Sequence, residues 1–119
     1  RKASRAMRVV VKRPCYKPFT VECDPNDPSV VRLALGVPHF VAIQTAVFDY
    51  TGLAVCHSGD ERDVINFFVG DDMDLTVRGS AIVSRVIGGR HVEMTDEDLA
   101  RALRIFEDYD GLRSFRDNS

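Results

Sequence analysis

Residues that could bind a metal ion are present in this chain of 119 residues, but their spacing does not bring them together. Cys56 and His57 are adjacent, and neighbouring residues of a strand point to opposite faces of a sheet, so they cannot share one ion without a bulge. We expect a buried thiol beside a surface histidine here, and neither a metal nor another cofactor. The other histidines and cysteines also fall at no zinc-ligand spacing: His39, His91, Cys15 and Cys23.

Acidic residues gather at positions 71–74 (Asp-Asp-Met-Asp), with Asp60, Glu61 and Asp63 shortly before them. A hard divalent cation needs several carboxylates that converge on one point. The alternating D-x-D-x-D-G pattern of a calcium loop is missing, and an exposed polar turn explains these acids adequately. We therefore expect a turn and no cation site.

Ser58, Ser80 and Ser84 are candidate nucleophiles, but none lies in a G-x-S-x-G elbow, and no cysteine lies in a catalytic signature. Gly88 and Gly89 lack a Walker or dinucleotide fingerprint, which indicates a hairpin turn and not a phosphate site. A Cys–His or Ser–His–Asp set assembled from distant residues stays open, because such sets are spatial. We assign no catalytic residue and rank an enzyme of unknown class third among the possible functions.

Basic charge is concentrated at the beginning of the chain. Residues 1–17 hold seven lysines and arginines and no acid, whereas residues 18–119 hold nine arginines against 18 acids, a net charge of −9. Such a segment can contact nucleic acid, with Tyr16 and Phe19 as stacking rings, or an acidic surface of a partner. Alternatively, the charges line a solvated edge strand and discourage aggregation. The nucleic-acid interpretation depends on Arg5, Arg8, Lys12, Arg13 and Lys17.

Size and composition are typical of one globular domain, with 45% hydrophobic and 29% charged residues. No stretch approaches the ~20 apolar residues of a membrane span, and no signal-peptide pattern follows the basic start, so we expect no membrane contact. Three cysteines without a C-x-x-C spacing favour free thiols and a cytoplasmic location. We expect a flexible basic extension at 1–6, a single domain at 7–111 and a polar tail at 112–119.

The first half of the domain predicts a β-hairpin and a short helix. Residues 7–13 suit a strand with both faces at least partly buried, and 19–23 alternate so that Cys23 faces the core with Phe19 and Val21. The helix should run over 29–35, after an Asp27 cap and Pro28 at its first position, and should stop at Gly36. Its buried residues should be Val30, Leu33 and Ala34.

The second half predicts further hairpins and a longer helix. One hairpin is expected from strands within 39–48 and at 53–57, joined by a turn at 49–52. A second is expected from strands at 80–87 and 90–94, joined by a turn at Gly88-Gly89. The secondary structure of residues 64–69 is left open. Thr95 should cap a helix, with Asp98 in the reciprocal place of a capping box, that buries Leu99, Ala102, Leu103 and Phe106 and ends at Gly111. The fold expected is α+β, a mostly antiparallel sheet of about five to seven strands with both helices on one face.

Six short motifs follow one another along the chain: 7–11 (MRVVV), 19–22 (FTVE), 66–67 (NF), 70–72 (GDD), 79–83 (GSAIV) and 92–99 (VEMTDEDL). In this order they resemble the domain-of-unknown-function family numbered thirty-eight forty-six, small proteins encoded largely by phages, plasmids and integrative elements. The likeness covers roughly residues 7–107. Residues 44–63 depart from the pattern, and a binding site of one subgroup would lie there.

The resemblance implies an accessory protein of a mobile genetic element, and not a reaction. We expect a non-enzymatic accessory or regulatory protein that binds a host or element protein, with interference with host defence as one instance. A small nucleic-acid-binding regulator that uses the basic segment is the alternative. The sequence leaves the identity of the protein partner and the presence of a homo-oligomer open.

Overall fold

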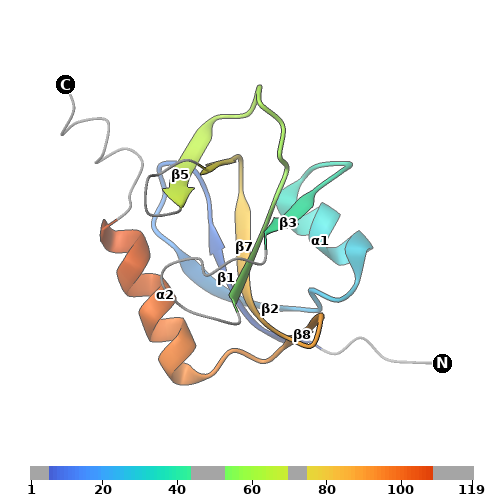
Figure 1. The fold of residues 1–119 in the computed structure, drawn as a ribbon, viewed down its shortest axis with the longest axis vertical. Helices are drawn as coiled ribbons and strands as arrows, with labels where there is room; N and C mark the ends of the chain where they lie inside the picture. Colours follow the sequence, from blue (N-terminus) through green and yellow to red (C-terminus); the bar gives the residue numbers. More distant parts are fainter. Residues whose placement is uncertain (1–5, 44–52, 70–74, 109–119) are drawn as a thin grey trace.

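The computed structural model describes residues 6–43, 53–69 and 75–108, and it confirms the α+β fold with a mostly antiparallel sheet (Figure 1). The main sheet has six strands: β1 (Met7–Lys12), β2 (Phe19–Cys23), β3 (Val41–Ile43), β4 (Leu53–His57), β7 (Ala81–Ile87) and β8 (Arg90–Val92). Their order is β2-β1-β7-β4-β3, and β8 pairs with β7 beside this path. The pairing of β3 with β4 and of β7 with β8 confirms two expected hairpins, although the 49–52 turn lies outside the described residues.

β1 lies inside the sheet, between β2 and β7. Val10 belongs to one hydrophobic cluster and Val9 and Val11 to another, so the strand is buried on both faces, as its β-branched run predicts. The idea that the basic segment lines an edge strand is therefore wrong for β1, because β7 pairs with its second side. The edge is β2. There Cys23 packs partly against the core as expected, whereas Phe19 is exposed.

α1 (Pro28–Leu35) begins and ends as its sequence predicts. The Asp27 carboxylate accepts a hydrogen bond from the Ser29 N–H at 3.0 Å, with Pro28 in the first turn. Gly36 ends the helix with φ of 71°, a left-handed conformation that glycine adopts without strain.

The buried side of α1 is not the expected one. Val31 and Leu35 pack on the sheet, whereas Leu33 is 84% exposed, Ala34 is exposed and Val30 is half-buried. Apolar residues occupy both sides of this two-turn helix, so the 3.6-residue period fits either side. The packing against the sheet decides between them.

α2 (Asp96–Asp108) has the expected capping box. The Thr95 hydroxyl accepts from the Asp98 N–H at 3.0 Å, and the Asp98 carboxylate accepts from the Thr95 N–H at 3.1 Å. The predicted stripe also faces the core, where Leu99, Ala102 and Phe106 are buried, although Leu103 is only partly buried. Gly111, the expected end of the helix, lies outside the described residues.

The two helices cover opposite faces of the sheet, which corrects the expectation that they share one face (Figure 1). α1 packs with Val9 and Val11, and α2 packs with Val10. Since side chains of a strand alternate between faces, these clusters are on opposite sides.

The 64–69 segment, left open by the sequence, contains a strand, β5 (Ile65–Val69), which pairs with β6 (Leu75–Arg78) in a separate two-stranded sheet. This hairpin shares the α2 face. Phe67 meets Phe106 edge to face, with ring centroids 4.9 Å apart, and Val77 joins the same cluster.

Candidate functional site

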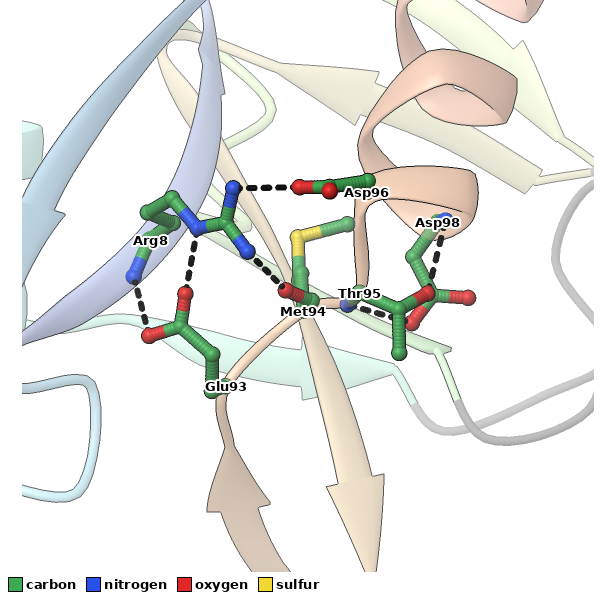
Figure 2. A network of polar contacts seen from close by, with 6 residues as sticks. All are labelled: Arg8, Glu93, Met94, Thr95, Asp96 and Asp98. Atoms are coloured by element: carbon green, nitrogen blue, oxygen red, sulfur yellow. Dashed lines mark hydrogen bonds and ion pairs between the residues drawn. The ribbon is translucent and has the colours of Figure 1, made fainter.

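Arg8, one of the five candidate nucleic-acid residues, is held within the protein (Figure 2). Its Nε donates to Glu93 at 2.5 Å, Nη1 to Asp96 at 2.7 Å and Nη2 to the Met94 carbonyl oxygen at 3.0 Å. These bonds raise the pKa of Arg8 and lower that of Glu93. Arg8 thus ties β1 to the segment between β8 and α2, and its charge is already neutralised.

Lys12 is also turned inward, with 1% of its surface exposed. Its Nζ donates to the Arg13 carbonyl oxygen at 2.7 Å and to Asn66 Oδ1 at 3.2 Å. The Asn66 amide donates in return to the carbonyl oxygens of Lys12 at 2.7 Å and Gly79 at 2.8 Å. The arrangement joins β1 to β5 and to the turn before β7. Lys12 therefore has a structural role, and Arg5 lies outside the described residues.

Arg13 and Lys17 remain exposed, beside two exposed aromatic rings. Arg13 Cζ lies 5.4 Å from the centre of the Phe19 ring, within the range of a cation–π contact, and Tyr16 is 71% exposed. Phe19 opens β2, whose outer side pairs with no described strand. We call Arg13, Tyr16, Lys17 and Phe19, with β2, the aromatic edge.

A cavity of about 580 Å³ lies between the β3–β4 end of the main sheet and β6. Apolar groups and polar groups both line it, and two of them carry opposite charges, Arg78 and Glu61. Three of its residues come from the 44–63 segment. The full lining is Val41, Ile43, His57, Gly59, Glu61, Thr76 and Arg78.

His57 is the most enclosed polar side chain of this cavity, with 4% of its surface exposed, so the expectation of a surface histidine is wrong. The Gly59 N–H donates to Nδ1 at 3.2 Å, and burial lowers the pKa of His57. The neutral ring therefore carries its proton on Nε2. Nε2 has no hydrogen-bond partner in the described part of the chain. In that part, every side-chain polar atom that is fully enclosed does have a hydrogen-bond partner. Nε2 must therefore reach accessible space, and His57 is one of the residues that line the cavity.

A tight turn fixes the position of Arg78. Its Nη1 donates to the Asp63 carbonyl oxygen at 3.2 Å, while the Asp63 carboxylate accepts from the Ser58 hydroxyl at 2.6 Å. Gly79 follows with φ of 70°, and a Cβ there would lie 2.9 Å from Asp63 Oδ2. Arg78 forms no ion pair with a described acidic residue. It is consequently a positioned cation that lines the same cavity as His57.

A serine and a histidine do meet elsewhere. Ser84 Oγ lies 2.6 Å from His91 Nδ1 on the α1 face, and burial lowers the pKa of His91. Ser84 is fully buried, however, so no substrate can reach its hydroxyl. The side-chain amide of Asn26 donates to the His91 carbonyl oxygen and accepts from the His91 N–H, at 2.9 Å each. The pair anchors β8 and is no nucleophilic site.

Among residues 6–43, 53–69 and 75–108, no three His, Cys, Asp or Glu side chains converge to hold a metal ion. Residues 71–74, the expected acidic turn, lie outside these ranges. Within the same part of the chain, none of the helices has the length and apolar character needed to cross a bilayer.

Comparison of the chain with protein-family models, with curated proteins and with solved structures finds no match. The family resemblance of the six short motifs therefore stays a prediction, and the cavity and the aromatic edge stand on their geometry. The sequence pointed to the aromatic edge through Tyr16 and Phe19. It missed the cavity, whose one sequence signal was a histidine beside a buried cysteine in a strand.

Proposed function

We propose that this protein is a non-enzymatic accessory or regulatory protein of a mobile genetic element, and that it acts by binding another protein through the aromatic edge. The observation that carries the proposal is the combination of exposed aromatic rings and cations with a strand, β2, whose outer edge pairs with no described strand. Exposed Tyr16 and Phe19 beside Arg13 are the residue types that dominate protein interfaces. The outer backbone groups of β2 can add a strand from a partner.

The charges define the kind of partner. Arg13 and Lys17 favour an extended acidic segment, and the element setting is supported by the resemblance of the short motifs. A host defence protein is one candidate partner. The alternative, a nucleic-acid regulator, has less support, because two of its five candidate contact residues, Arg8 and Lys12, form hydrogen bonds within the protein.

Affinity capture from lysate of the host cell, with and without nuclease, tests the proposal. We expect a protein to be retained after nuclease, lost with Tyr16→Asp and retained with Leu33→Asp, which changes another exposed apolar position, on α1. Thermal melts confirm that both variants fold. Capture that nuclease abolishes, with binding of short nucleic acids that falls steeply with salt, would establish the alternative.

A further inference from the structure

We propose that the cavity between β3–β4 and β6 is a binding site for a small zwitterion with an apolar body, of which a leucine-type amino acid is the simplest example. This site is separate from the aromatic edge, and the inference does not depend on the protein-binding proposal. It rests on four kinds of group that border one space: a cation, an enclosed hydrogen-bond donor, an acid and two aliphatic side chains.

The anionic end of the ligand is recognised by Arg78 and His57. Arg78 keeps its guanidinium in place through Asp63, which leaves further N–H groups for a carboxylate. His57 offers an Nε2–H whose orientation is fixed, because Gly59 occupies the other ring nitrogen. A donor in a largely enclosed side chain gains most from a charged acceptor, since water reaches it poorly.

The other end of the ligand is defined by Glu61, Val41 and Ile43. Glu61 is exposed on the same cavity and would repel a simple anion, whereas it attracts the ammonium group of a zwitterion. Val41 and Ile43 lie on one face of β3 and present their aliphatic side chains to the apolar body. Volume is not limiting, since 580 Å³ lies within the usual range of small-molecule sites.

Three probes with the same apolar body test the site on the unmodified protein by NMR titration: L-leucine, 4-methylpentanoate and L-leucinamide. 4-Methylpentanoate lacks the ammonium group, and leucinamide lacks the carboxylate. We expect leucine to shift signals of His57, Arg78 and Ile43, and leucinamide to bind about tenfold or more weakly, because it loses the charged acceptor. 4-Methylpentanoate should bind a few-fold more weakly than leucine, as expected for an exposed ion pair.

Variants assign the two charges. Arg78→Gln should reduce leucine binding about tenfold or more, and Glu61→Gln should lower it to the level of 4-methylpentanoate. Arg32→Gln, on the α1 side, and Glu22→Gln, on β2, are the matched controls and should change nothing. Equal binding of leucine and leucinamide overturns the proposal, as does the absence of shifts at about 10 mM, well above the ~1 mM dissociation constant of a weak ligand. Equal binding of leucine and 4-methylpentanoate overturns the role of Glu61.

Discussion

Gly36 and Gly79 have the same backbone conformation, with φ of 71° and 70°, but different surroundings. A Cβ at Gly36 would meet nothing within 4 Å, whereas at Gly79 it would press on the Asp63 carboxylate that Ser58 holds. We expect Gly36→Ala to cost about 1–2 kcal/mol of unfolding free energy, which is the left-handed strain alone. Gly79→Ala should cost about 1 kcal/mol more, through the added contact. Denaturant unfolding of both variants measures the difference. Equal losses of unfolding free energy would show that the Asp63 side chain moves aside without cost.

Cys56 makes the stability depend on alkaline pH. Burial raises the pKa of its thiol from the ordinary 9.0 to about 11. Between pH 9 and pH 11 mainly the unfolded chain loses this proton, so stability falls as the pH rises through this window, by at most about 3 kcal/mol.

The variant Cys56→Ala isolates this effect, because every other titrating group is shared with the parent protein. The difference in unfolding free energy between the parent protein and Cys56→Ala should become smaller as the pH rises through this window. Urea unfolding below pH 9 and near pH 11 measures this difference. A gap that stays constant with pH would mean that water reaches the thiol in the folded protein.

At the scale of elements, the packing of α2 stabilises the fold more through Phe106 than through Leu103. Phe106 is 1% exposed and meets Phe67 edge to face, whereas Leu103 is only partly buried. Phe106→Ala should therefore cost about 3–5 kcal/mol and Leu103→Ala about 1–2 kcal/mol. Thermal melts of the two variants compare them directly. A larger loss for Leu103→Ala would indicate that α2 packs in a different rotation.

Local signals predicted where both helices begin and where α1 ends. Asp27 with Pro28, and Thr95 with Asp98, satisfy N–H groups of the turn that they start, so neighbours in sequence contain the information. The buried side of α1 was missed for the opposite reason. Whether Val31 or Leu33 faces inward depends on β-strands far away in sequence, and both residues are apolar.

At the scale of the whole molecule, the charge count misled about Arg8 and Lys12. Their partners, Glu93 and Asn66, are 85 and 54 residues away in the sequence. A local sequence pattern does not predict hydrogen bonds between residues that are so far apart. The cavity escaped prediction similarly, since Arg78 and His57 come from strands of different sheets. Alternation correctly separated Cys56 from His57, but it could not show that a second sheet would cover the histidine.

The position of β7 between β1 and β4 determines when this protein can fold during its synthesis. Val10 and Val55 both pair with Val83, so neither early strand gains its central neighbour until β7 has been translated. At ribosomal rates the roughly 60 residues between β2 and β7 take about 3–12 s to make. Throughout that interval the nascent chain carries a valine-rich strand with one unsatisfied edge, which exposes it to chaperones and to pairing with neighbouring nascent chains. Folding is therefore completed late, and slow translation lengthens the period of exposure.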